Sequence, residues 1–173
     1  PLVQKAVLDQ LTTAPKAIIL DTMNFWMDTA LEYLHDVVRR VNIIVINDDE
    51  AKQLSGKHSL LEAAEEISKL GPQYIIIKKG EFGATLFGEN NQFNLPAFPV
   101  KEVIDPTGAG DTFAGGLAGF LSEQKEINFK SLKEAMVHGT VMASFCVENF
   151  GTMSMKNLEK QEFINRLKEF KKS

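Results

Sequence analysis

Three short apolar runs, separated by stretches with helical spacing, constrain the fold more than any other feature of this sequence. The runs are AIIL (17–20), IIVI (43–46) and YIIIKKG (74–80). Strands that are apolar along their whole length, without alternation, are typical of parallel sheets that helices cover on both faces. We therefore expect an α/β fold in three layers, α/β/α, with a mainly parallel sheet in the middle.

The other segments complete the expected order of elements. ATLFG (84–88) and QFNLPAF (92–98) follow the third apolar run across Gly-containing turns, and they predict antiparallel strands at one edge of the sheet. No linker, repeat or break in composition divides the chain, so we expect residues 1–173 to form a single domain. Helical spacing predicts helices at 2–13, 29–41, 48–54, 59–70, 109–123, 129–148 and 157–171.

Composition indicates a soluble globular protein. The 173 residues are 44% hydrophobic, yet no apolar run approaches the about 20 residues of a membrane-spanning helix, and the first residues do not resemble a signal peptide. The single cysteine, Cys146, excludes an internal disulfide, and its apolar neighbours predict a core thiol. A formal charge of −4 argues against nucleic-acid binding. We expect a cytoplasmic protein that contacts neither a membrane nor nucleic acid.

The segment DPTGAGDTFAGG (105–116) contains a proline, four glycines and two aspartates. Such a density of glycine is costly unless something must approach the backbone closely. If a helix begins within the segment, the N–H groups of Gly108, Ala109 and Gly110 are free at the positive end of its dipole, which favours an anion. Asp111 would lie beside that anion. A carboxylate there needs a separate task, such as taking a proton from an attacking hydroxyl.

Other interpretations of this segment need no phosphate. A Pro-containing turn with an aspartate near a helix N-terminus would only stabilise the helix, by about 0.3–1 kcal/mol. A dinucleotide fingerprint would require a third glycine where Phe113 stands, and a strand before the motif in place of a turn. The Walker pattern G-x-x-x-x-G-K-[ST] does not occur in the chain. The anion site and the simple turn therefore stay open.

Several motifs together resemble the ribokinase-like (PfkB) family of carbohydrate and nucleoside kinases. DPTGAGDTFAGGLAGFL (105–121) is similar to its C-terminal signature, D-T-x-G-A-G-D followed by a helix of small residues. INDDE (46–50) resembles its N-x-x-E element, and IIIKKGEFGATLF (75–87) its V-x-[TK]-x-G-x-x-G strand pair. MASFCVENFG (142–151) resembles its late helix and loop. The resemblance covers essentially the whole chain and implies a ribokinase-like fold.

The resemblance implies catalytic roles for the glycine-rich segment. Asp111 would be the base that deprotonates a hydroxyl of the acceptor. The N–H groups of Gly108, Ala109 and Gly110 would stabilise charge on the phosphoryl group that ATP transfers. The expected reaction is therefore phosphoryl transfer from ATP to an alcohol.

The resemblance also implies nucleotide and metal contacts. Asn47 and Glu50 would position Mg²⁺, largely through water. The same spacing also fits a helix N-cap with its capping-box partner. Lys78 would contact phosphate, and Gly80 and Gly83 would let the nucleotide approach the backbone, but a solvated lysine at the sheet edge is the alternative. The sequence leaves both alternatives open.

Two further segments can be compared with the family pattern. Backbone carbonyls of Asp105 and Thr107, with the loop around Gly151, correspond to positions that hold K⁺ in many relatives, but side-chain identity does not test carbonyl geometry. The segment DTMNFW (21–26) lacks the Pro and the Arg of the family's D-P-N-x-R. A phosphate or substrate role for Asp21 and Asn24 is therefore doubtful.

Relatives in this family are longer and carry an N-terminal half with a sugar-recognition segment and a small β-sheet lid. We expect residues 1–173 to be the C-terminal part of such a kinase, without that half or the lid. The resemblance also implies a homodimer formed through the missing lid. The expected function is an ATP-dependent, Mg²⁺-requiring kinase for a small sugar, sugar phosphate or nucleoside. The alternative is a nucleotide-binding regulatory module of the same fold without turnover.

Overall fold

The computed structural model describes residues 1–151 and 153–172, which form two compact units. The first unit comprises Pro1–Lys79 and Thr85–Phe93, and the second comprises Gly80–Ala84 and Asn94–Ser173. That residues 1–173 form one domain stays a prediction.

Five strands form one sheet in the order β1-β2-β3-β4-β5. The first three run parallel, with Asp21 opposite Val45 and Asn47 opposite Lys78. Glu89 and Asn90 have φ of 52° and 58°, the backbone of a tight two-residue turn, which joins β4 to β5 as an antiparallel hairpin. The strands are β1 (Ile19–Asp21), β2 (Ile43–Asn47), β3 (Tyr74–Lys78), β4 (Ala84–Gly88) and β5 (Asn91–Leu95). The expected mixed sheet is confirmed.

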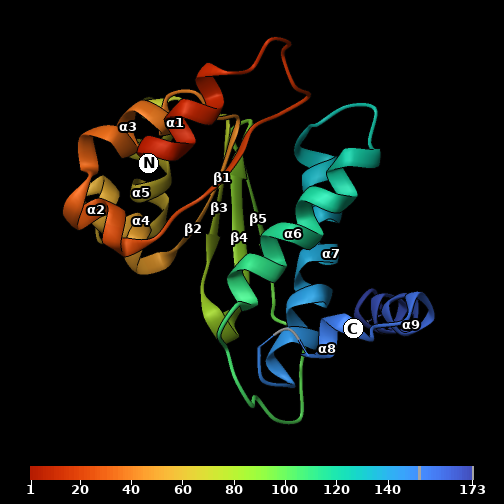
Figure 1. Cartoon of the computed structure of the whole chain (residues 1–173). Helices are drawn as coiled ribbons and strands as arrows, with labels where there is room; N and C mark the ends of the chain where they lie inside the picture. The colour runs from red at the N-terminus through yellow and green to blue at the C-terminus, as the bar shows by residue number, and fades with distance from the viewer. Residues whose placement is uncertain (152, 173) are drawn as a thin grey trace. The chain divides into compact units, whose positions relative to one another are not determined.

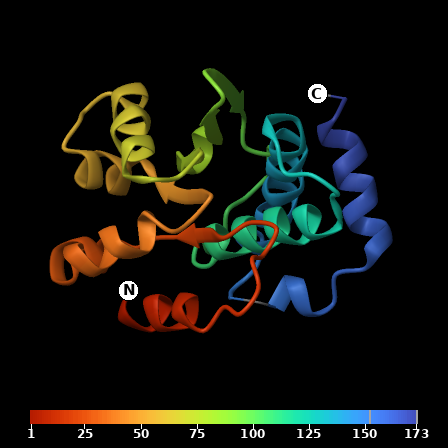
Figure 2. The same ribbon diagram turned by 90° about the horizontal axis from the view of Figure 1, so that it is seen from above.

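The core of the first unit explains why β2 and β3 are apolar up to their last residues, Asn47 and Lys78. Each of these strands has four consecutive buried residues. Ile44, Ile46, Ile75 and Ile77 belong to one buried cluster with residues of α3, α4 and α5, so these helices cover one face of the strands (Figure 1, Figure 2). The helices of this unit are α1 (Leu2–Asp9), α2 (Asn24–Thr29), α3 (Leu31–Val38), α4 (Asp48–Ser55) and α5 (Leu60–Leu70).

Several helix boundaries differ from the predicted ones. The helix predicted over 2–13 ends at Asp9, ahead of two threonines and Pro15, which disfavours helical backbone at the residue before it. The helix predicted over 29–41 is two helices, α2 and α3, separated at Ala30, whose φ of −150° is not helical. The last predicted helix begins at Lys160 because Glu159 is its N-cap. The short α8 was not predicted.

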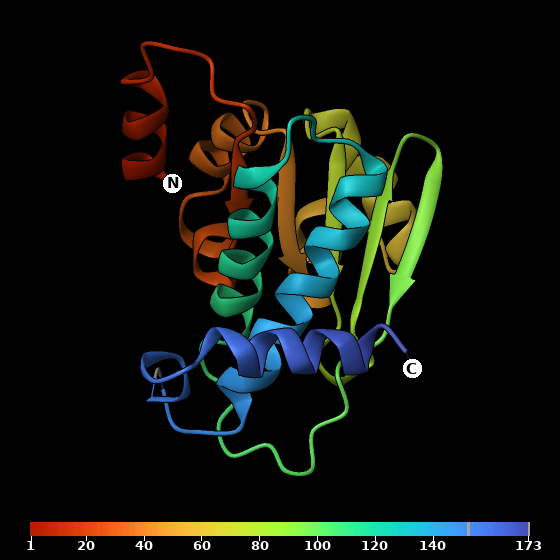
Figure 3. The same cartoon turned by 90° about the vertical axis from the view of Figure 1, so that its right-hand side faces the viewer.

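Two helices of the second unit pack closely through glycine (Figure 3). A Cβ on Gly116 would lie 2.9 Å from Cγ of Met142, and a Cβ on Gly139 would lie 2.7 Å from the carbonyl oxygen of Phe113. The small residues of the glycine-rich segment therefore serve helix contact as well as the helix start. The elements of this unit are the 3₁₀ turn η1 (Gly80–Phe82) and helices α6 (Ala109–Glu123), α7 (Phe129–Val147), α8 (Met153–Lys156) and α9 (Lys160–Phe170).

The helices can be compared with the length and hydropathy of a membrane span. Within residues 1–151 and 153–172, none is both long enough and apolar enough to cross a bilayer.

We expect Gly139→Ala to lower the free energy of unfolding by about 1–3 kcal/mol, because the new methyl group would overlap the backbone of α6. Gly119→Ala is the matched control in α6. A Cβ there meets nothing within 4 Å, and alanine favours helix over glycine by up to about 1 kcal/mol. Urea unfolding of both variants measures the difference. Equal effects of the two substitutions would contradict close packing at Gly139.

Candidate active site

Polar side chains gather where β1, β2 and β3 end, within the first unit. The carboxyl ends of parallel strands meet at one edge of a sheet, where ligands of open α/β sheets bind. Lys78 Nζ lies 2.9 Å from Asp21 Oδ1, and the two side chains are only 19% and 25% exposed. The alternative of a solvated edge lysine is therefore wrong: Lys78 forms a partly buried ion pair, and β3 is a central strand. A role for Lys78 toward phosphate stays a prediction.

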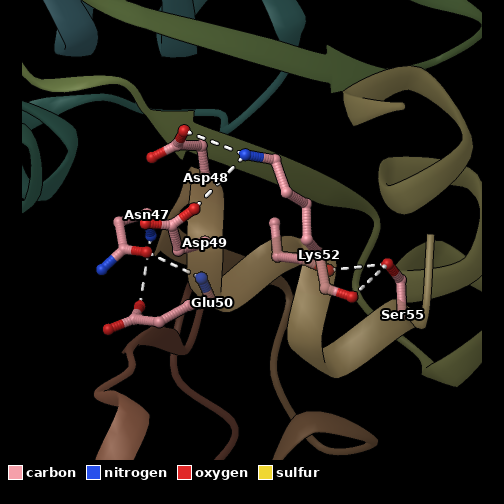
Figure 4. A network of polar contacts seen from close by, with 7 residues as sticks. Asn47, Asp48, Asp49, Glu50, Lys52 and Ser55 are labelled. Atoms are coloured by element: carbon pink, nitrogen blue, oxygen red, sulfur yellow. Dashed lines mark hydrogen bonds and ion pairs between the residues drawn. The ribbon is translucent and has the colours of Figure 1, made fainter. Parts of the chain in front are cut away.

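Asn47 and Glu50 form a complete capping box at the start of α4 (Figure 4). Asn47 Oδ1 accepts a hydrogen bond from the Glu50 N–H at 2.7 Å, and Glu50 Oε2 accepts one from the Asn47 N–H at 3.2 Å. The capping box that was the alternative for Asn47 and Glu50 is therefore present. It does not exclude a metal role, because Mg²⁺ keeps much of its water and can be held through it.

A third residue holds Glu50 and was missed by the sequence analysis. The Thr22 hydroxyl donates to Glu50 Oε2 at 2.8 Å, and both side chains are buried. A buried carboxylate is costly unless hydrogen bonds satisfy it, and Thr22 supplies one. The only sequence signal was indirect: Thr22 stands where the family pattern D-P-N-x-R has its Pro.

The first turn of α4 is strongly acidic. Asp48 and Asp49 lie between the two capping-box residues, and Lys52 Nζ lies 3.3 Å from a carboxylate oxygen of each (Figure 4). Hydrogen bonds to Asp49 and then Asp48 raise the pKa of Lys52. Across residues 1–151 and 153–172, no three His, Cys, Asp or Glu side chains are grouped to hold a metal ion. A Mg²⁺ site at Asn47 and Glu50 stays a prediction.

The two glycines after β3 differ in what they do. A Cβ on Gly83 would lie 2.0 Å from the Leu95 carbonyl oxygen, so the packing of the chain itself requires glycine there. A Cβ on Gly80 would meet nothing within 4 Å, although its φ of 56° favours glycine. Of the two, only Gly80 has open space beside it for a ligand.

The glycine-rich segment does begin a helix. Gly108 is the N-cap of α6 with φ of 82°, and Asp111 is exposed in the first turn. The Ala109 N–H donates to the Pro106 carbonyl at 3.1 Å, so the prediction of a free N–H at Ala109 is wrong. In the described part of the chain, the N–H groups of Gly108, Gly110 and Asp111 have no backbone acceptor. Three donors therefore remain at the positive end of α6.

The loop before α6 converges with the end of α7. Asp105 Oδ1 accepts a hydrogen bond from the Thr107 N–H at 2.9 Å. Hydrogen bonds from the Thr107 side chain, which has the largest effect, from the Thr107 backbone and from the Gly151 backbone lower the pKa of Asp105. Cys146 Sγ lies 3.5 Å from the Thr107 carbonyl oxygen and 4.0 Å from that of Gly151. Cys146 is therefore the buried thiol that was expected. A K⁺ site at the carbonyls of Asp105 and Thr107, with the loop around Gly151, stays a prediction.

Sequence relatives of this chain are sugar and nucleoside kinases. The chain is 39% identical over 93 residues to a cytidine kinase of Thermococcus kodakarensis, covering 51% of this chain and 33% of that protein. It is 34% identical over 113 residues to an aminoimidazole riboside kinase of Salmonella typhimurium, covering 65% of this chain and 35% of that protein. The chain thus spans about a third of the length of these curated relatives.

Solved structures agree with this result. An aminoimidazole riboside kinase of Salmonella enterica, in complex with aminoimidazole riboside and an ATP analog, superimposes with a TM-score of 0.77 at 28% identity, covering 87% of this chain and 52% of that one. A ribokinase of Thermotoga maritima gives a TM-score of 0.72 at 26% identity, covering 97% and 52%. The ribokinase-like fold is confirmed. Residues 4–160 match the model of the pfkB family of carbohydrate kinases, and the chain belongs to that family.

Proposed function

We propose that this chain supplies the ATP-binding and catalytic part of a kinase that phosphorylates a hydroxyl of a small sugar, sugar phosphate or nucleoside. The observation that carries the proposal is the start of α6. There an exposed carboxylate, Asp111, accompanies backbone N–H groups that have no backbone acceptor among the described residues. An ordinary helix start would also favour a carboxylate there. The match of residues 4–160 to the pfkB family supports a phosphate site over a simple turn.

The chemistry follows from the charges at this helix end. The N–H groups of Gly108 and Gly110, with the positive end of the helix dipole, would stabilise the negative charge of the transferring phosphoryl group. Asp111 would accept the proton of the attacking hydroxyl, which makes that oxygen a better nucleophile. Ala109 contributes through its position in the turn, since its own N–H is bonded to Pro106.

The strand-end groups would serve the nucleotide. Lys78 would neutralise phosphate charge, and its ion pair with Asp21 holds the ammonium at the edge of the sheet before nucleotide binds. Asn47 and Glu50 would hold Mg²⁺ through water, and Gly80 would leave room for the nucleotide. The assignment of ATP is supported by the solved relative that holds an ATP analog.

The proposal also covers the monovalent cation, the location and the acceptor. K⁺ would bind carbonyls of Asp105 and Thr107 and the loop at Gly151, in keeping with the convergence of two of these carbonyls on Cys146. The site works in the cytoplasm, where the single cysteine stays reduced. Two relatives, a cytidine kinase and an aminoimidazole riboside kinase, motivate the proposal of a sugar or nucleoside acceptor. Residues 1–173 act together with an acceptor site and a lid, through which a homodimer forms.

A screen of acceptors tests this function. The longest polypeptide that contains this sequence is incubated with ATP, Mg²⁺ and one member each of a panel of pentoses, hexoses, sugar phosphates and nucleosides, and ADP release is followed. We expect at least one acceptor to raise the rate well above the acceptor-free rate. ATP binding without acceptor-dependent ADP release across the panel would favour the regulatory module.

We expect Asp111→Asn to lower kcat by about 100-fold or more with the best acceptor, because the amide cannot take up the hydroxyl proton. Nucleotide affinity should change little, since the backbone donors remain. Glu123→Gln at the other end of α6 is the control for the lost charge and should leave kcat unchanged. An Asp111→Asn enzyme that keeps more than half of the wild-type kcat would rule out the base.

Glu50→Gln should raise the Mg²⁺ concentration that gives half-maximal rate, since the amide has lost the charge that attracts the hydrated ion. Asn47→Ala removes the cap and should lower the free energy of unfolding by about 0.5–2 kcal/mol. Rate is titrated against Mg²⁺, and melting is measured, for both variants. A Glu50→Gln enzyme with unaltered Mg²⁺ dependence would leave the pair with its structural role alone.

A further inference from the structure

We infer that Arg166 of α9 is a positioning residue for the anion site at the start of α6. The inference rests on the function proposed above and concerns the second unit only. Arg166 does not touch the site; it acts through the last turn of α7 and through the segment that leads into α6. We call residues 99–107 the entry loop.

Arg166 clamps the end of α7 by several contacts at once. Its Nη1 lies 2.8 Å from Glu148 Oε2 and donates to Ser144 Oγ at 3.1 Å. The Ser144 hydroxyl in turn donates to the Val141 carbonyl at 2.6 Å, so its donor and acceptor are both used. The guanidinium lies 3.6 Å from the centroid of the Phe145 ring, a cation–π contact. With only 19% of its side chain exposed, Arg166 is held in one place.

The end of α7 holds the entry loop. The Val147 carbonyl accepts hydrogen bonds from the N–H groups of Ile104 at 2.8 Å and Asp105 at 3.3 Å. One residue earlier, Cys146 Sγ contacts the Thr107 carbonyl at 3.5 Å. The residue after Thr107 is Gly108, whose N–H belongs to the proposed phosphate donors. A shift of the last turn of α7 would therefore displace the donors directly.

The same arginine also reaches the other end of the entry loop. Its guanidinium lies 5.1 Å from the centroid of the Phe98 ring, and that ring makes an edge contact of 5.6 Å with Phe170 in the last turn of α9. Figure 3 shows α9 crossing the end of α7. Arg166 thus contacts both anchors of the entry loop, which are Phe98 and the end of α7.

The entry loop needs such anchors because its own structure is sparse. Residues 99–107 contain no helix or strand, and most of them are exposed. The hydrogen bond from the Thr107 N–H to Asp105 closes only a short turn. Donors that bind a transferring phosphoryl group must be held in place in advance to lower the barrier. Arg166 would supply this order from outside the loop.

Hydrogen exchange and nucleotide titration of the 173-residue chain test the inference, with Arg166→Met, Arg166→Lys and Lys168→Met. Lys168 is exposed on the same helix, so its variant controls for the lost charge. For Arg166→Met we expect faster exchange at the amides of residues 104–110 and about 3- to 30-fold weaker ATP binding. Arg166→Lys should restore part of both effects, because it keeps the charge beside Glu148 but not the planar stack on Phe145. Lys168→Met should change neither.

The outcomes separate this inference from the proposed function. A lower melting temperature for Arg166→Met, with exchange at 104–110 and ATP affinity unchanged well below melting, would make Arg166 merely structural and overturn the inference. If Arg166→Met does not fold, Glu148→Ala, which removes one contact of the clamp, must show the same change at 104–110, or the inference fails. If the wild-type chain binds no ATP, the proposed function is contradicted. Faster exchange at 104–110 in Arg166→Met would still support the contacts of Arg166 in that case.

Discussion

Parallel pairing of β2 with β1 and β3 is the constraint on which the strand-end site depends. It buries the middle of each strand, so β2 and β3 are apolar, and it brings their polar ends to one edge. Glu50 can be buried there because β2 ends at its capping partner and the residue after β1, Thr22, donates to it. Lys78 can lie largely out of solvent because Asp21, two strands away, pairs with it. The charges of Glu50, Lys78 and Asp21 are thus each compensated by a group that the pairing brings.

Glycine has more than one purpose in the second unit. Gly108 supplies the left-handed backbone at the start of α6, while Gly116 and Gly139 let α6 and α7 come together. The first purpose leaves N–H groups without a backbone acceptor among the described residues, and the second fixes the helix that carries Asp111. Since the end of α7 also holds the entry loop, helix packing and donor placement are physically linked in this unit.

The sequence predicted the elements whose signal is local. The runs at β2 and β3 marked strands because burial on both faces leaves only apolar residues, and the glycine-rich segment marked the start of α6 correctly. It could not separate a solvated Lys78 from a paired one, because the partner is 57 residues away in the chain. The break at Ala30 is hidden in a continuous helical pattern, and the loss of the Ala109 donor depends on how one turn closes. Contacts of Thr22 and Arg166 arise only when distant segments meet.

Backbone NMR of the ¹⁵N-labelled chain during titration with ATP and Mg²⁺ tests the central claim most directly, namely that phosphate binds at the start of α6. We expect the amide signals of Gly108, Gly110 and Asp111 to shift progressively with ATP and less with adenosine, which lacks phosphate. Amides at the far end of α6, near Glu123, should stay in place. A folded chain in which ATP leaves Gly108, Gly110 and Asp111 unshifted would contradict the claim.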